Sequence, residues 1–135
     1  MESLYQEQLL ALARKAREKH PCGQHTHHAQ ANNPVCGDRV SAQLTVTDNI
    51  IADADIQVKG CALCEAGAGL WLDAVIGCRP DRLGQIHDDI RGWLDGTLKT
   101  VPLDSAVALE PVKAIKNRHK CVLLAFSTAG KFTPL

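Results

Sequence analysis

Residues 39–59 read RVSAQLTVTDNIIADADIQVK, and this stretch decides the fold. Apolar and polar residues alternate in both halves, which is the period of a β-strand with one buried and one exposed face. Asp48 and Asn49 separate the halves, and residues of this type form two-residue hairpin turns. The pattern predicts an antiparallel hairpin. The apolar face of its second strand is expected to consist of Ile50, Ala52, Ala54, Ile56 and Val58.

A two-residue turn also sets the pairing of the two hairpin strands. If Thr47 faces Ile50, the same register continued outward brings Cys36 opposite Cys61. Asp38 lies two residues after Cys36, on the same side of an extended chain. The sequence therefore predicts that two thiols and one carboxylate meet at one end of the sheet.

Helical periodicity marks much of the remaining chain. In residues 3–19 apolar side chains recur every three or four positions, which predicts a helix with one buried stripe. Residues 20–34 are rich in Pro, Gly, His and Asn without a repeating pattern, so we expect a loop. The last helix is expected to begin after Pro111, because proline inside a helix removes a hydrogen bond. The other expected helices run from Gly60 to Gly77, from Pro80 to about Gly96 and over about 105–109, and the last ends at Gly130.

This order of elements predicts one α+β domain over residues 1–135. We expect a small antiparallel sheet, made of the hairpin with room for one short extra strand, and helices packed on one face of it.

Composition narrows the class of function. The chain has 15 Lys and Arg against 15 Asp and Glu, without a block of like charges, so neither nucleic acid nor a membrane surface is an expected partner. It shows neither a signal-peptide pattern nor an apolar run of membrane-spanning length, which favours a cytoplasmic location. Thiols stay reduced in the cytoplasm, so the six cysteines indicate metal binding or catalysis before disulfides.

A tetrahedral metal site needs a fourth ligand beside Cys36, Asp38 and Cys61, and Cys121 is the best remaining thiol. The three residues before it, residues 118–120, are all basic or imidazole side chains. Positive charges stabilise a thiolate, so we expect a lowered pKa for the Cys121 thiol.

Three sequence contexts carry a family resemblance. Residues 33–38 read NPVCGD, Gly60 and Cys61 close the hairpin before a helix rich in small residues, and VLLA follows Cys121. Together, over roughly residues 2–130, they resemble the iron–sulfur cluster scaffold family typified by IscU and the N-terminal part of NifU. The resemblance implies that a transient 2Fe–2S cluster or a zinc ion is held by Cys36, Asp38, Cys61 and Cys121.

The same resemblance implies a scaffold or carrier rather than an enzyme, with a cysteine desulfurase as sulfur donor and apo iron–sulfur proteins as recipients. Because the basic neighbours of Cys121 favour its thiolate, Cys121 is the expected persulfide acceptor, ahead of Cys61 and Cys36. Residues 109–113, LEPVK, resemble the motif that the family's Hsp70 chaperone reads, but one proline is missing and Cys121 follows too far downstream. Chaperone binding is therefore not expected.

One departure leaves two functions open. The typical scaffold has histidine directly before its last cysteine, whereas this chain has Lys120 there and His119 one position earlier. This arrangement is similar to the SufU branch, whose members resemble zinc-bound sulfur acceptors. The alternative function is accordingly a zinc-bound sulfur relay for a cysteine desulfurase.

The remaining cysteines and histidines have simpler interpretations. Cys22 and Cys78 are expected to be spectators. Cys64 forms a Cys-x-x-Cys pair with Cys61, which indicates either a small dithiol oxidoreductase or, preferably, a semi-buried thiol one helical turn on, because no βαβ pattern surrounds it. A closed structural zinc site remains the other alternative for the four ligands. Solvated loop residues are expected at His25, His27 and His28, in preference to zinc ligands, and a surface position at His87.

Overall fold

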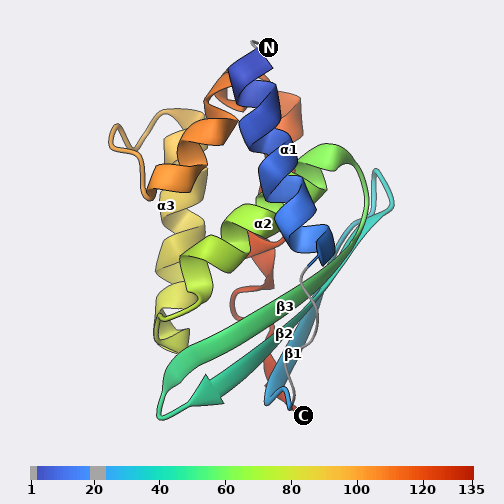
Figure 1. Cartoon of the computed structure of the whole chain (residues 1–135), viewed down its shortest axis with the longest axis vertical. Helices are drawn as coiled ribbons and strands as arrows, with labels where there is room; N and C mark the ends of the chain where they lie inside the picture. Colours follow the sequence, from blue (N-terminus) through green and yellow to red (C-terminus); the bar gives the residue numbers. More distant parts are fainter. Residues whose placement is uncertain (1–2, 19–23) are drawn as a thin grey trace.

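The computed structural model describes residues 3–18 and 24–135, so Cys22 lies outside the described residues. Its strands form one antiparallel sheet in the order β3-β2-β1-β4, and helices α1 and α2 lie across one face of it (Figure 1). The α+β prediction is thus confirmed. In chain order the elements, with η marking 3₁₀-helices, are α1 (Ser3–Glu18), β1 (His27–Asn33), β2 (Asp38–Thr47), β3 (Ile50–Lys59), α2 (Ala62–Val75), η1 (Pro80–Arg82), α3 (Leu83–Asp95), η2 (Asp104–Ala114), η3 (Lys116–Arg118), α4 (His119–Leu123), η4 (Phe126–Thr128) and β4 (Thr133–Pro134).

The predicted hairpin and its turn are confirmed. Strands β2 and β3 pair antiparallel with Thr47 facing Ile50. Asp48 and Asn49 have φ angles of 53° and 63°, and this left-handed backbone at both turn positions is that of a type I′ turn. The turn matches the right-handed twist of the strands, so it fixes their pairing next to the turn.

The register prediction fails two residues beyond the turn. Val46 pairs with Ile51, but Thr45 pairs with Asp53, so Ala52 is an extra residue in β3. Such a bulge shifts the alternation by one position. Ile51 is consequently 0% exposed and joins the core, whereas Ile50, which the alternation places in the core, is 39% exposed.

The segment predicted as a loop over residues 20–34 contains strand β1 instead, which pairs with β2 from His27 to Asn33. Its inward residues are Ala29 and Ala31, each 2% exposed, between polar neighbours. Alanine carries little hydrophobic signal, so the alternation was too weak to indicate a strand. β4 pairs with the other side of β1, and the sheet therefore has two strands beyond the hairpin.

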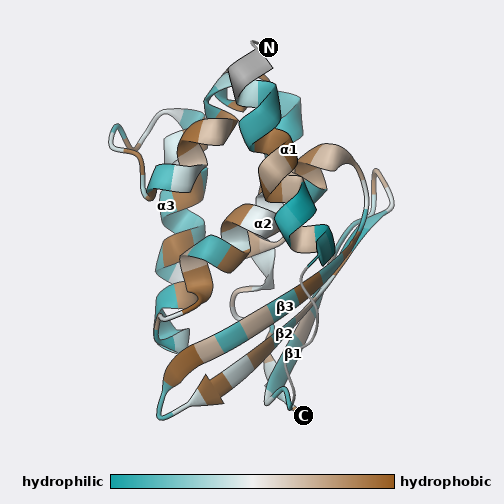
Figure 2. Cartoon of the chain, in the orientation of Figure 1, coloured by the Kyte–Doolittle hydropathy of each residue, from teal (hydrophilic) through white to brown (hydrophobic). Residues whose placement is uncertain are grey.

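Two glycines let the helices approach closely. A Cβ atom at Gly69 would lie 1.9 Å from the carbonyl oxygen of Leu12 in α1, and one at Gly67 would lie 2.2 Å from that of Val122 in α4. Helix α2 therefore packs in van der Waals contact with both neighbours, backbone against backbone. The surrounding core is apolar, and Trp71 is among its largest fully buried side chains. Figure 2 shows hydrophobic residues (brown) recurring along α2 and along the strands.

The C-terminal half is divided into more short helices than predicted. Helix α3 follows Pro80 and ends at Gly96, whose φ of 88° confirms the predicted stop. Pro111 lies inside η2, so the expectation that a helix ends before it is wrong. A 3₁₀-helix is held by hydrogen bonds between residues three apart. Proline lacks a backbone N–H, so it removes only the one hydrogen bond that its own N–H would donate. The single last helix is likewise replaced by η3, α4 and η4.

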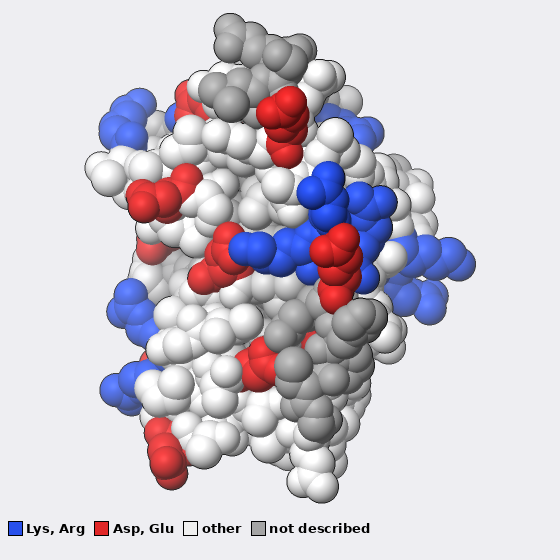
Figure 3. Space-filling model, in the orientation of Figure 1, with Lys and Arg blue, Asp and Glu red and all other residues white. Residues whose placement is uncertain are grey.

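Charges of both signs are interspersed on the face shown in Figure 3. Ion pairs join α1 to α2, between Lys15 and Asp73 and between Arg17 and Glu65. None of the helices in the described ranges has the length and apolar character needed to cross a membrane.

Candidate metal centre

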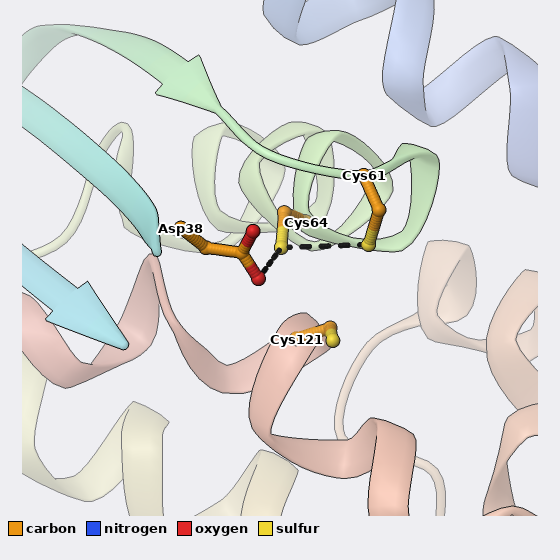
Figure 4. A group of neighbouring side chains, drawn as sticks. All are labelled: Asp38, Cys61, Cys64 and Cys121. Carbon is orange, nitrogen blue, oxygen red and sulfur yellow. Dashed lines mark hydrogen bonds between the residues drawn. The ribbon is translucent and has the colours of Figure 1, made fainter. Parts of the chain in front are cut away.

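Four side chains converge where the sheet meets the start of α2. They are Asp38, Cys61, Cys64 and Cys121, and their ligand atoms all lie within 4.8 Å of one another (Figure 4). Asp38 and Cys61 are half-buried, and the other two are buried. The chain thus gathers three thiols and one carboxylate from β2, α2 and α4.

Local structure positions each of these groups. Asp38 is the first residue of β2, beside the outermost pair of the hairpin, Arg39 and Lys59. β3 then leads through Gly60 into α2, whose extended N-cap residue is Cys61. Residues three apart lie on the same side of a helix, so Cys64 follows on the face of Cys61.

Hydrogen bonds connect the four groups. The Cys64 thiol donates to Asp38 Oδ2 at 3.3 Å, and the Cys61 thiol lies 3.6 Å from Cys64 Sγ (Figure 4). Arg118 Nη2 donates to Cys61 Sγ at 3.3 Å. The guanidinium group therefore sits where it stabilises a thiolate on Cys61.

The thiols differ in pKa. Burial raises the pKa of Cys61, but hydrogen bonds from the backbone N–H and thiol of Cys64 and from the N–H of Leu63 outweigh it, so the pKa lies below 9.0. The pKa of the Cys64 thiol is raised, mainly by burial and to a smaller extent by its hydrogen bonds with Asp38 and Cys61. The pKa of the Cys121 thiol is also raised, mainly by burial and to a smaller extent by the charge of Cys61. In the metal-free centre, Cys61 is the thiol that ionises first.

The expectation of a lowered pKa at Cys121 is therefore wrong. Lys120 points into solvent. His119 Nε2 lies 3.0 Å from the carbonyl oxygens of both Val112 and Lys113, away from the thiol. The cationic side chain that does reach the centre, Arg118, bonds to Cys61 instead.

Cys36 lies apart from the group. It is exposed on the loop between β1 and β2, and the bulge in β3 has shifted the register that was to bring it opposite Cys61. Asp38, Cys61 and Cys121 meet as the sequence predicts, whereas Cys64 joins them unpredicted. Its three-residue spacing from Cys61 was the signal for this position.

The other candidates also lie outside the four-residue group. The Cys78 thiol donates to the carbonyl oxygen of Ala74 at 3.2 Å. His27 and His28 belong to strand β1 rather than to a loop. His87 is half-buried on α3 rather than fully at the surface, and burial lowers its pKa.

The donor set suits a metal that prefers soft ligands. Thiolates select zinc, copper(I) and iron–sulfur clusters, and carboxylate oxygen is an accepted zinc ligand. A spread of 4.8 Å among the four ligand atoms is small enough for one ion to touch them all after minor side-chain movement. The residues present therefore fit both a zinc ion and thiolate-bound iron.

Fold and centre together define a small α+β protein with a cysteine-rich candidate metal centre at one end of the β2–β3 hairpin. The chain matches the NifU-like N terminal domain over residues 4–118 and belongs to that family. The match ends before Cys121, which the fold nevertheless brings to the centre.

Several known proteins are similar to this chain. The iron–sulfur cluster assembly scaffold protein IscU of Thermotoga maritima is 29% identical over 131 residues, which cover 93% of this chain and 89% of that protein. The zinc-dependent sulfurtransferase SufU of Bacillus subtilis is 26% identical over 102 residues, or 74% and 69% of the two chains. The crystal structure of a NifU-like protein (N-terminal) from Brucella abortus superposes with a TM-score of 0.75 at 26% identity, over 92% of this chain and 88% of that one.

Proposed function

We propose that this protein is an iron–sulfur cluster assembly scaffold of the cytoplasm. It accepts sulfur from a cysteine desulfurase, builds a 2Fe–2S cluster and passes the cluster to apo-proteins. The observation that carries the proposal is the convergence of Asp38, Cys61 and Cys121, from separate parts of the chain, at the end of the hairpin where β3 leads into α2. Relatives named as IscU scaffolds support it.

The cluster is the cargo, and the family resemblance assigns Cys36, Asp38, Cys61 and Cys121 to hold it. Thiolate sulfur binds iron strongly, whereas carboxylate oxygen is a harder and weaker partner for a cluster. Asp38 is therefore the ligand that we expect to exchange first during transfer. A site designed for release differs in this from a closed structural site, which favours Cys and His.

Sulfur delivery is a thiol exchange. A thiolate of this protein attacks the outer sulfur of the desulfurase persulfide, a new S–S bond forms, and the desulfurase cysteine leaves as thiolate. Two sulfane sulfurs need four electrons to become sulfides. Two Fe²⁺ ions supply two as they become Fe³⁺, and a dithiol reductant supplies the other two.

Cys121 is the acceptor that we propose from the sequence, and Cys61 is its competitor in the structure. Cys121 is only 2% exposed, so a persulfide reaches it only if α4 moves. Cys61 is half-buried, and its sulfur already accepts a hydrogen bond from Arg118. Mass spectrometry of Cys121→Ser and Cys61→Ser after incubation with desulfurase and cysteine decides between them, because the true acceptor's variant gains no sulfane sulfur.

Anaerobic reconstitution tests the scaffold function. The protein is incubated with Fe²⁺, cysteine, a cysteine desulfurase and a dithiol, and then separated from small molecules. We expect a charge-transfer absorption spectrum, equal amounts of iron and acid-labile sulfide, and activation of an apo-ferredoxin on mixing. A protein that keeps zinc and takes up neither iron nor sulfide would contradict the proposal.

A zinc-bound sulfur relay is the second candidate, and one observation favours it. Among the described residues no histidine reaches the centre, because the His119 ring bonds to two backbone carbonyls instead. The relative named as a zinc-dependent sulfurtransferase agrees with this candidate. A relay would speed desulfurase turnover in its zinc form without forming a cluster, which a desulfurase turnover assay with the zinc-loaded protein measures beside the reconstitution.

A further inference from the structure

We propose that Cys64 is a resolving thiol, which attacks a persulfide on Cys61, releases its outer sulfur as sulfide and closes a disulfide between the two cysteines. The inference rests on the proposed function, because Cys61 is a candidate sulfur acceptor there. It leaves the cluster ligands as the family resemblance assigns them, and it gives a role to a thiol at the centre that those ligands do not include.

The Cys64 thiol is closed to solvent but open to Cys61. Its Sγ lies 3.6 Å from Cys61 Sγ, in the space between Cys61 and Asp38 (Figure 4). The side chain is 0% exposed, so a thiol or persulfide of another protein does not reach it. A nucleophile buried in this way reacts with a neighbour inside its own protein, and a thiol is in contact with it.

The backbone at the start of α2 allows the two sulfur atoms to join. Cys61 is the N-cap residue with an extended backbone, φ −79° and ψ 173°, and Cys64 follows inside the first turn of the helix. Cys-x-x-Cys pairs of this kind are reactive in thiol–disulfide exchange. An S–S bond is about 2.0 Å long, and rotation of the two side chains covers the difference from the present separation.

Neighbouring groups handle the proton and the charge of the step. The Cys64 thiol donates a hydrogen bond to Asp38 Oδ2 at 3.3 Å, so the carboxylate is in position to accept the proton as the sulfur attacks. Arg118 Nη2 donates to Cys61 Sγ at 3.3 Å, which places a positive charge beside the bond that breaks. The negative charge that develops on the leaving sulfur is stabilised by this guanidinium group.

The reaction reduces sulfane sulfur to sulfide. Cys64 Sγ bonds to Cys61 Sγ, the bond from Cys61 Sγ to the outer sulfur breaks, and the electron pair of that bond leaves with the outer sulfur. The proton from Cys64 passes through Asp38 to this sulfur, which departs as hydrosulfide. The outer sulfur gains two electrons, and the two cysteine sulfurs together lose two. A dithiol reductant then opens the disulfide, becomes a disulfide itself and restores both thiols.

This route supplies the two electrons for each 2Fe–2S cluster that iron does not provide. Sulfide is released beside Asp38 and Cys61, where the cluster is proposed to form, rather than in bulk solvent. While the disulfide is closed, Cys61 cannot bind iron, so cluster assembly waits for the reductant at this step.

Sulfide release from the persulfide-loaded, metal-free full-length protein tests the inference. The protein is treated with inorganic polysulfide and desalted without reductant, and the released sulfide is trapped with a bimane reagent. We expect one sulfide for each disulfide formed. Digestion after Lys59 and after Glu65 separates Cys61 and Cys64 from the other cysteines, and mass spectrometry should find these two joined within peptide 60–65. A lasting persulfide, or a disulfide between Cys61 and Cys121, would overturn the inference.

Matched variants separate Cys64 from the other thiols. Sulfide release should slow on the order of tenfold or more in Cys64→Ser, because the attacking sulfur is gone from its position next to the persulfide. Cys78→Ser, whose thiol hydrogen-bonds to Ala74 outside the centre, should release sulfide as the parent does. Equal rates in the parent and Cys64→Ser would overturn the inference.

Two further controls keep the result unambiguous. Circular dichroism checks the fold of Cys64→Ser, and if this variant does not fold, the peptide from the unsubstituted protein decides. Loading with polysulfide involves neither a desulfurase nor iron. Failure of the reconstitution above would therefore overturn the scaffold function and leave the resolving role of Cys64 as measured.

Discussion

Cys64 Sγ donates a hydrogen bond to Asp38 Oδ2 at 3.3 Å, and this contact joins the first turn of α2 to the first residue of β2. Gly60, at the end of the hairpin, lies beside this contact, because a Cβ atom there would be 3.1 Å from Cys64 Sγ and from Asp38 Oδ1. The candidate metal centre is therefore built on the junction between sheet and helix, and its geometry depends on how closely these two elements approach.

Gly60→Ala should disturb the centre more than the fold. Its new Cβ atom would lie 3.1 Å from Asp38 Oδ1 and from Cys64 Sγ, so one of these two side chains must shift. We expect about a tenfold loss of zinc affinity, equivalent to about 1.4 kcal/mol. Chelator competition measures it, and Gly84→Ala, where the new atom meets nothing within 4 Å, is the control. Unchanged affinity in Gly60→Ala would show that the ligands are not held by this junction.

Gly69→Ala and Gly67→Ala should each destabilise the fold. The added methyl groups would overlap backbone carbonyls of Leu12 and Val122, which cannot rotate away as a side chain can. Overpacking of this kind costs about 3 kcal/mol or more, which urea unfolding monitored by circular dichroism detects. Gly84→Ala, in the open face of α3, should instead gain up to about 1 kcal/mol. Equal midpoints for all three variants would contradict the close helix packing.

The pH dependence of thiol alkylation should distinguish Cys61 from Cys121 in the metal-free protein. Alkylation requires the thiolate. The pKa of Cys61 is lowered and that of Cys121 is raised, so the rate at Cys61 should reach its half-maximum below pH 9.0 and that at Cys121 above it. Each profile is followed by peptide mass spectrometry, and its midpoint reports ionisation separately from access. Midpoints in the opposite order would restore Cys121 as the more acidic thiol.

Asp38→Ala should lengthen the life of a bound cluster. Removing the carboxylate removes the oxygen ligand that exchanges most readily, so transfer to an apo-ferredoxin should slow by roughly tenfold while the cluster spectrum persists. Stopped-flow absorption follows the transfer, and Cys78→Ala, with its thiol bonded to Ala74, serves as the matched control. Unchanged transfer kinetics would remove this role from Asp38.

The sequence predicts structure best where a clear local pattern specifies one element. Alternating residues around Asp48 and Asn49 predicted the hairpin and its turn, and Gly60 with Cys61 predicted the start of α2. The bulge at Ala52 left no mark in the sequence, because Ile50 and Ile51 are equally apolar and either can face the core. It is tertiary packing that selects Ile51.

The centre was predicted in part for the same reason. The hairpin predicted that Asp38 and Cys61 meet, and Cys121 was added as the best remaining thiol; the structure brings the three together. The position of Cys36 depended on a register that the bulge changes, and the effect of the basic residues depended on where their side chains point. The Arg118 side chain donates a hydrogen bond to Cys61 rather than to Cys121, and the order of residues alone does not determine that orientation.

Zinc binding by a short alanine series tests most directly the claim that separate parts of the chain build one metal centre. Stoichiometry and affinity are measured by chelator competition and metal analysis on the parent, Cys61→Ala, Cys121→Ala and Cys78→Ala. We predict one zinc ion per chain, retained by Cys78→Ala and weakened on the order of a hundredfold or more in Cys61→Ala and Cys121→Ala. A series in which Cys78→Ala loses as much affinity as Cys61→Ala would contradict the assignment.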